Sequence, residues 1–265
     1  MVVNDNALST FFELKFHQNF QRVVKRLKIY LADPNNEKNV HDVRTSLRRL
    51  DTFYSLLPKK LRKRNRKQIE KYKEFFRANS KIRDLDIIRN KVAVLAKGAP
   101  DASKLELQLQ RKRRIELGKA VKLARTLKKV PSMHVTGTPL SKIELRINKM
   151  IERLSIRTNE MLPLILSDDT KKEELHILRK KCKKMRYILE VLPENHVKKY
   201  TKKIGGAIGR KDLKETQEML GSIHDSDITI EYLQNSRSRF AKQLVVKEAG
   251  RRDHLYREFV KYIKD

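Results

Sequence analysis

Apolar residues recur along most of the chain at intervals of three and four, the spacing that places them on one side of an α-helix. In the first such segment these positions are Phe12, Phe16, Phe20, Val23, Val24 and Leu27. The segment ends before Pro34, because proline cannot continue a helix. The same periodicity predicts further helices at about 38–57, 59–79, 84–97, 102–129, 140–166, 171–192, 195–205, 210–221 and 226–264. With only 8 Gly and 7 Pro to form turns, the pattern predicts an all-α protein.

One segment interrupts this pattern near the middle of the chain. Residues 130–139 contain two Pro and one Gly between helical stretches, and such residues are typical of a connection. We therefore expect two halves, at about 1–130 and 140–265, joined by a linker at about 130–139.

The two halves repeat each other. Residues 41–58 align without gaps with 176–193 at an offset of 135, with His, Arg, paired basic residues, apolar residues and Pro in register. Later in each half, residues 82–87 align with 223–228 at an offset of 141, and Lys73 matches Lys214 in that register. Two blocks in the same order indicate an internal duplication, and therefore a pseudo-two-fold structure.

Within the repeated block, basic residues fall on one face of the predicted helix. Each residue turns a helix by about 100°, so His176, Arg179, Lys183, Arg186 and Tyr187 share a face. The opposite side is apolar and suited to packing. The first repeat places His41, Arg44 and Arg48 alike, but Asp51 stands where the second repeat has Arg186.

The net charge of the chain indicates which class of partner this basic face binds. Lys and Arg number 63 against 32 Asp and Glu, a formal net charge of +31, which indicates an anionic partner. The stripe from His to the position ten residues on is about 15 Å long, enough for several consecutive phosphates. Arg, Lys and protonated His all donate hydrogen bonds to phosphate oxygens. Because clustered anions favour the imidazolium, binding should strengthen at mildly acidic pH.

The pattern H-x-x-R-x-x-x-[RK]-[RK]-[apolar]-R-Y at His176 to Tyr187, its near match from His41 to Leu50, and the two later [RH]-D-x-D blocks resemble the CHAD family, the conserved histidine α-helical domain. This resemblance covers the whole chain. It implies two four-helix bundles, related by a pseudo-two-fold axis and forming one compact unit. It also implies a cationic surface that binds inorganic polyphosphate without catalysing a reaction.

Carried over by position, the resemblance assigns polyphosphate binding to His41, Arg44, Arg48, Arg49, His176, Arg179, Lys183, Lys184, Arg186 and Tyr187. The matched positions of the later blocks extend this candidate site to Lys73, Arg83, Lys214 and His224. Asp51 and Thr52 depart from the family's basic and Tyr positions, so the first half is expected to bind differently from the second.

Four aspartates accompany the later blocks, namely Asp84, Asp86, Asp225 and Asp227. They cannot favour an anion directly. We expect them to cap the N-terminus of a following helix or to orient nearby Arg side chains. The basic runs at 59–67 and 111–114 are interpreted as solvated surface that could supplement polyanion binding.

Two other functions are less consistent with the sequence. His41-Asp42 and His224-Asp225 resemble metal-ligand pairs of phosphohydrolases, but Asp42 has no acidic counterpart in the second repeat. No phosphate-binding loop and no nucleophile with its base is found, so we expect no enzyme activity, no cofactor and no metal. Nucleic-acid binding is the alternative function, because a cationic helical protein attracts RNA and DNA non-specifically.

Several features of the sequence bear on where in the cell the protein is found. Cys182 is the single cysteine, which excludes an intramolecular disulfide, and no long apolar run could span a bilayer. The N-terminal residues do not resemble a secretion signal. We expect a cytoplasmic protein, associated with polyphosphate granules and not inserted in a membrane. The sequence does not define its oligomeric state.

Overall fold

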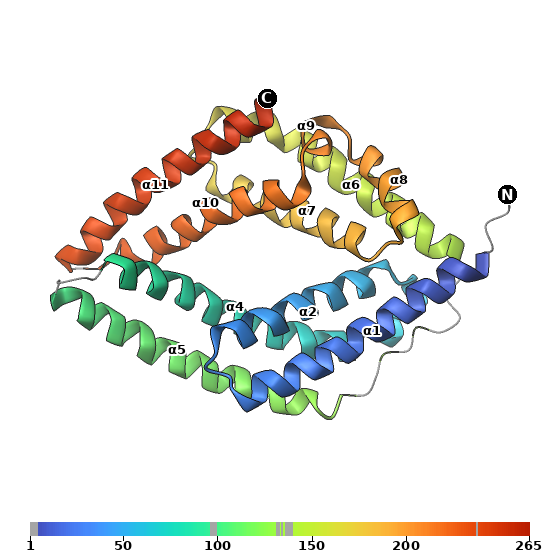
Figure 1. Ribbon diagram of the computed structural model, residues 1–265, viewed down its shortest axis with the longest axis horizontal. Helices are drawn as coiled ribbons and strands as arrows, with labels where there is room; N and C mark the ends of the chain where they lie inside the picture. The colour runs from blue at the N-terminus through green and yellow to red at the C-terminus, as the bar shows by residue number, and fades with distance from the viewer. Residues whose placement is uncertain (1–4, 96–99, 131–132, 134, 136–139, 237) are drawn as a thin grey trace. The chain divides into compact units, whose positions relative to one another are not determined.

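The computed structural model describes residues 5–95, 100–130, 133, 135, 140–236 and 238–265. Within these ranges the chain forms helices without strands, which confirms the all-α prediction (Figure 1). The helices are α1 (Asp5–Ala32), α2 (Glu37–Leu56), α3 (Lys59–Arg64), α4 (Arg66–Leu95), α5 (Pro100–Leu127), α6 (Leu140–Ser167), α7 (Lys172–Glu190), α8 (Glu194–Ile204), α9 (Gly206–Arg210), α10 (Leu213–Leu233) and α11 (Arg239–Lys264). None of these helices combines the length and the apolarity that a membrane span requires.

Polar side chains begin several helices in the way that the sequence indicates. The Asn36 side chain accepts from the Lys38 backbone N–H at 2.9 Å, which caps α2. Asp212 accepts from the N–H of Glu215 at 2.7 Å and caps α10. Each cap satisfies a backbone donor that the first turn of a helix leaves without a partner.

Two predicted helix breaks are wrong. The sequence places breaks at about 79–84 and 221–226, but α4 and α10 run through these positions without interruption. The actual breaks come at Asn65, whose side chain donates to the Leu61 carbonyl at the end of α3, and at 234–238 before α11. Asp84, Asp86, Asp225 and Asp227 therefore lie inside helices, and the prediction that they cap following helices is wrong.

The chain forms two compact units, each assembled from three segments. Unit 1 comprises Met1–Arg83, Glu116–Arg153 and Lys184–Lys203. Unit 2 comprises Asp84–Ile115, Leu154–Lys183 and Ile204–Asp265. Each unit therefore contains residues from both sequence repeats. The division into halves at 1–130 and 140–265 stays a prediction about the repeat, and its linker at 130–139 lies outside the described residues except for Val130, Met133 and Val135.

Aromatic side chains form much of the contact between α1 and α2 in unit 1, where the two helices lie side by side (Figure 1). The Phe53 ring meets the edges of Phe12 and Phe16 at centroid distances of 5.4 and 5.9 Å. Tyr30 and Phe75 make a similar contact between α1 and α4 at 5.3 Å. Edge-to-face geometry places the positive edge of one ring on the negative face of the other.

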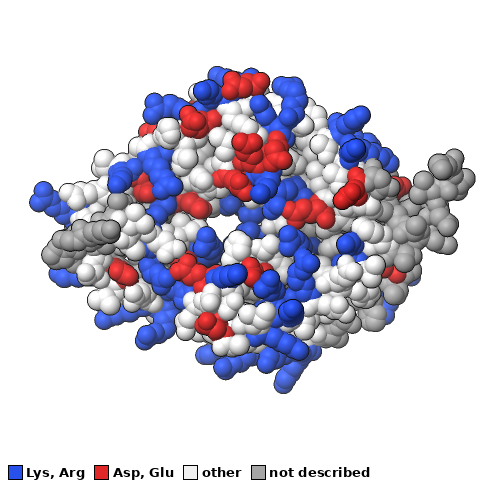
Figure 2. Space-filling model, in the orientation of Figure 1, with Lys and Arg blue, Asp and Glu red and all other residues white. Residues whose placement is uncertain are grey.

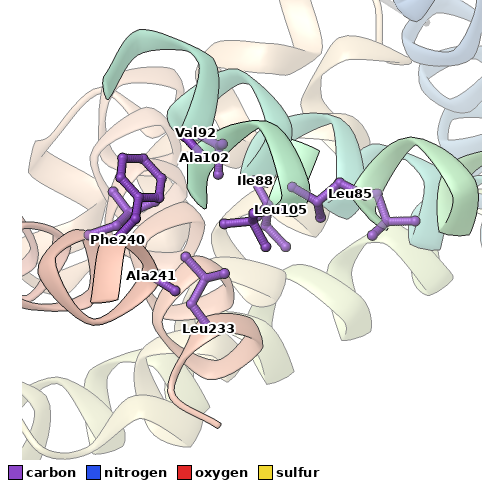
Figure 3. Packing of buried hydrophobic residues seen from close by; sticks show 10 residues of the cluster. Leu85, Ile88, Val92, Ala102, Leu105, Leu233, Phe240 and Ala241 are labelled. Atoms are coloured by element: carbon purple, nitrogen blue, oxygen red, sulfur yellow. The ribbon is translucent and has the colours of Figure 1, made fainter. Parts of the chain in front are cut away.

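Unit 2 has a core of mainly aliphatic side chains with one aromatic residue, Phe240 (Figure 3). It joins α4, α5, α10 and α11, which supply Leu85, Ile88, Val92, Ala102, Leu105, Leu109, Leu233, Phe240, Ala241 and Leu244. Their burial from water supplies the main stabilising contribution in this unit.

The aspartates of the later sequence blocks hold arginines, as the second interpretation of them proposes. Asp86 of α4 accepts from the Nε of Arg113 on α5 at 2.5 Å, and both side chains are buried. Asp227 of α10 accepts from the Nε of Arg252 on α11 at 3.0 Å. Both pairs belong to unit 2, and each links one helix to the next along the chain. Arg113 of the basic run 111–114 is therefore part of the interior and not of a solvated surface.

Removal of the buried Asp86 carboxylate tests how much the Asp86–Arg113 pair stabilises the protein. Replacement Asp86→Ala leaves the buried guanidinium of Arg113 without this counter-charge and should lower the free energy of unfolding by about 3 kcal/mol. Urea denaturation followed by circular dichroism measures the change. The exposed Asp33→Ala control should stay within about 0.5 kcal/mol of the wild type. Equal effects of the two substitutions would contradict a structural role for the pair.

Candidate functional site

The first repeated helix, α2, carries its cations against α4 in unit 1. The Arg44 and Arg48 guanidinium groups both lie over the Phe76 ring, each 5.3 Å from its centroid. Arg44 is 7% exposed and donates through Nη1 to the backbone carbonyl of Asn79 at 2.7 Å. Arg48 is half-buried, so it is the more accessible of the two. Phe76 thus holds two predicted ligand-binding cations by cation–π contacts.

His41 begins this face of α2 and is exposed. Burial of its ring, followed by the charge of Arg83 on α4, lowers its pKa below the usual value of 6.5, while Asp42 opposes this shift. Arg48 and Arg44 lower the pKa of His41 further. The structure therefore brings Arg83, the residue matched to His224 in the sequence, close to the histidine of its own repeat.

The second repeated helix, α7, makes the corresponding contact in unit 2. The rings of His176 and His224, from α7 and α10, lie with their centroids 4.4 Å apart and their planes tilted by 36°. Nδ1 of His176 is buried and has no hydrogen-bond partner among the described residues. Each repeat therefore pairs its helix-start histidine with the matched residue of the later block.

Both imidazoles are held neutral. Burial and the cations Lys180, Arg179 and Lys183 lower the pKa of His176 to about 4. Burial and the same three cations, together with His176, lower the pKa of His224 to about 3. An imidazolium at either position would face positive charge in a partly dry environment, so the ligand-free protein disfavours it.

Asp51 of α2, which stands where the second repeat has Arg186, has basic neighbours. Its carboxylate lies 3.6 Å from Nζ of Lys73 on α4 and 3.7 Å from Nζ of Lys184 on α7. The ammonium of Lys73 also lies 5.5 Å from the centroid of the Tyr54 ring. Burial lowers the pKa of Lys184, Lys73 and Arg146 add to that shift, and Asp51 opposes it. Two predicted ligand-binding lysines thus share one carboxylate.

Glu190, at the end of α7, holds two further predicted residues. Nε of Arg49 donates to its Oε2 at 3.3 Å, and Nη1 of Arg186 donates to its Oε1. The Arg186 guanidinium also covers the Tyr187 ring at 4.6 Å from its centroid. Tyr187 itself is 4% exposed, so its ring belongs to the packed side of the helix.

Lys214 is placed apart from the histidine pair. It is exposed in the first turn of α10, and its nearest acid, at 4.0 Å, is Glu218 on the same helix. Ten residues separate it from His224 on the same helix, which is about 15 Å along the axis. The sequence match between Lys73 and Lys214 is therefore not reflected in similar surroundings.

Sequence reasoning missed three participants. Lys180 follows His176 by four residues on α7, a spacing that puts it on the same face and that the sequence itself could have revealed. Glu190 lies four residues after Arg186 on α7, so the sequence could have revealed that pair as well, whereas its contact with Arg49 comes from another helix. Phe76 had no such signal, because the cations that it contacts lie on another helix. Within the described ranges, no three His, Cys, Asp or Glu side chains converge so that they could hold a metal ion.

Cations are spread widely over the visible surface (Figure 2). Lys and Arg, drawn in blue, occur on every described part of this face, with groups of Asp and Glu, drawn in red, between them. The surface charge is therefore not confined to the candidate residues, and what distinguishes those residues is their repeated arrangement around His41 and His176.

These features define a class of helical protein in which a helix with one histidine and several basic residues occurs twice. A family model described as the CHAD domain matches residues 16–234. The chain therefore belongs to the CHAD-domain family. No curated protein matches it.

The histidine pair makes folding stability depend on pH. The ordinary pKa of His is about 6.5 in an unfolded chain. His176 and His224 stay neutral in the folded protein down to a pKa of about 4 and about 3. Between pH 7 and pH 5 the unfolded state therefore binds more protons, and the free energy of unfolding falls as the pH falls. We expect the double variant His176→Asn, His224→Asn to lose less stability over this interval than the wild type.

Chemical denaturation at pH 7 and at pH 5 measures this difference. His254→Asn, which removes an exposed histidine, serves as the control and should lose as much stability as the wild type. If the double variant and the wild type lost equal stability, the pair would not be the source of the pH dependence.

Proposed function

We propose that this protein binds inorganic polyphosphate without catalysing a reaction. The observation that carries the proposal is the repeated juxtaposition of a helix-start histidine with the matched residue of the later block, His41 with Arg83 and His176 with His224. Membership of the CHAD-domain family supports the choice of ligand. The formal charge of +31 supports an anionic partner but does not select one.

The accessible groups define how the ligand would be held. Arg48 and Arg83 offer planar guanidinium forks to phosphate oxygens in unit 1, and Arg179 and Lys183 offer cations next to the histidine pair in unit 2. Arg44 and Tyr187 are buried, so we assign them supporting positions beneath these groups. Consecutive phosphates along a flexible chain would meet several such donors, which favours a polymer over a single phosphate.

Nucleic acid is the alternative ligand, and competition separates the two. At about 150 mM salt, where exposed charges are substantially screened, long-chain polyphosphate should displace labelled single-stranded RNA from the protein. RNA at equal phosphate concentration should not displace labelled polyphosphate. Fluorescence anisotropy measures both directions. Displacement of polyphosphate by RNA would overturn the proposal.

A second prediction separates the candidate residues from net charge. The triple variant Arg83→Gln, Arg179→Gln, Lys183→Gln should weaken polyphosphate binding at least about tenfold, because each charged hydrogen bond contributes about 1.5–3 kcal/mol. The control variant Arg64→Gln, Arg66→Gln, Lys67→Gln removes the same charge and the same residue types from an exposed basic run. It should weaken binding only about two- to threefold, as expected from screened surface charge.

Isothermal titration of both variants measures the change, and helical circular dichroism checks that they fold. Equal losses from the two triple variants would show that total charge, and not the arrangement around the histidines, determines binding.

Ligand binding should also change the protonation of the histidine pair. Phosphate charge next to His176 and His224 offsets the burial and the cations that keep both rings neutral, so each pKa rises when the ligand binds. Binding then takes up protons, and affinity for polyphosphate increases as the pH falls from 8 to about 5.5. Titration calorimetry in buffers of different ionisation enthalpy measures this uptake. Affinity that is independent of pH would place the ligand away from the pair.

A further inference from the structure

Asp51 and Glu190 are acids in the midst of residues assigned to an anionic ligand. Between them they engage Lys73, Lys184, Arg49 and Arg186, all in unit 1. From this arrangement we infer that the two carboxylates are intramolecular competitors of the ligand, which occupy its cations in the ligand-free protein and so lower the affinity of this face. The inference rests on the proposed function and names the residues that set its strength.

The position of Asp51 in the repeat supports this role. It stands where the second repeat has Arg186, so an acid replaces a base at a matched position of the stripe. Asp51 contacts cations on two other helices, Lys73 on α4 and Lys184 on α7. A residue that merely covered the surface would not need these contacts. The carboxylate thus takes the place that a phosphate oxygen would take.

The charges around Lys184 indicate what the Asp51 carboxylate does in the absence of ligand. Burial and the neighbouring cations Lys73 and Arg146 disfavour the ammonium form, and Asp51 favours it. In the ligand-free protein the neighbouring Asp51 thus opposes the lowering of the Lys184 pKa. A bound phosphate would supply the same compensation, so carboxylate and phosphate are alternatives at this position.

Exposure shows that the acids can be displaced. The Asp51 and Glu190 side chains are 43% and 28% exposed, and their cationic partners are between 21% and 34% exposed. Ion pairs in contact with water are weak, because solvent and salt screen them and holding two long side chains costs entropy. A polyanion with several neighbouring charges can therefore exchange with both carboxylates, whereas a single phosphate gains little from each exchange.

The contacts also join two helices that carry the repeated motif. Arg49 of α2 meets Glu190 of α7, and Asp51 of α2 meets Lys184 of α7. Ligand exchange would break both bridges. Removal of the acids should therefore lower the stability of the ligand-free protein slightly while it raises affinity, and a purely structural role would not predict this opposition of signs.

The test compares neutral variants of the acids with matched controls. Asp51→Asn and Glu190→Gln should each bind long-chain polyphosphate about three- to tenfold more tightly than the wild type, as expected when a weak competing pair is removed. Asp33→Asn and Glu258→Gln make the same changes of residue and charge at exposed positions and should alter affinity less than twofold, within the effect of screened surface charge. Calorimetric titration at about 150 mM salt measures all four variants.

A second comparison tests whether Asp51 acts through its lysine partners. Lys184→Gln should weaken binding little in the wild type, where Asp51 engages this lysine, and more strongly in the Asp51→Asn background. Circular dichroism checks that each variant folds. Affinities of Asp51→Asn and Glu190→Gln equal to those of their controls would overturn the inference while leaving the proposed function in place. Failure of the wild-type protein to bind polyphosphate would overturn both.

Discussion

Repulsion between like charges is the constraint on which the rest of this structure depends. A chain with a net charge of +31 folds only if its cations are screened, paired or held apart. The structure uses buried acids for the arginines of its interior, as in the Asp86–Arg113 contact. It uses an aromatic ring for Arg44 and Arg48, and shared carboxylates for the half-exposed cations of α2 and α7.

The same repulsion determines the chemistry of the candidate site. Because burial and the surrounding cations lower the pKa of His176 and His224, both rings are neutral in the ligand-free protein at physiological pH. In unit 1, Asp51 and Glu190 partly compensate the cations that they contact. The candidate site therefore contains groups whose protonation or ion pairing an incoming anion would change. Its affinity depends on what an incoming anion changes, both in the protonation of the histidines and in the pairing of the cations.

Much of the fold could be predicted from the sequence, since the apolar periodicity gave helices whose ends agree with the structure at α2, α6 and α7. The breaks inside α4 and α10 were predicted because Asp favours helix starts, but an ion pair to the following helix outweighs that preference at Asp86. Local preference cannot reveal a partner twenty-seven residues away.

The sequence predicted the candidate site about as completely as it predicted the fold. Helical geometry gives the direction of a side chain but not its depth, which is why Arg44 could be placed on the basic face and yet is buried against Asn79. The matched register of the two repeats assigned Arg83 and His224 to the candidate site, and the structure brings them to His41 and His176, respectively. Phe76 contacts cations of another helix, and Glu190 contacts Arg49 of another helix, and only the folded structure brings these groups together.

The interleaving of the two units along the chain has a consequence for biosynthesis. Unit 1 needs segments that extend to Lys203, so its core cannot be completed while the ribosome is still adding the preceding residues. Until then the aromatic faces of α1 and α2 lack some of their native neighbours, and contacts between distant segments also slow folding. The nascent chain is at this stage a long, strongly cationic polymer beside ribosomal RNA. Premature adsorption to that RNA is a hazard that this order of assembly creates, and one that a chaperone or a competing polyanion would relieve.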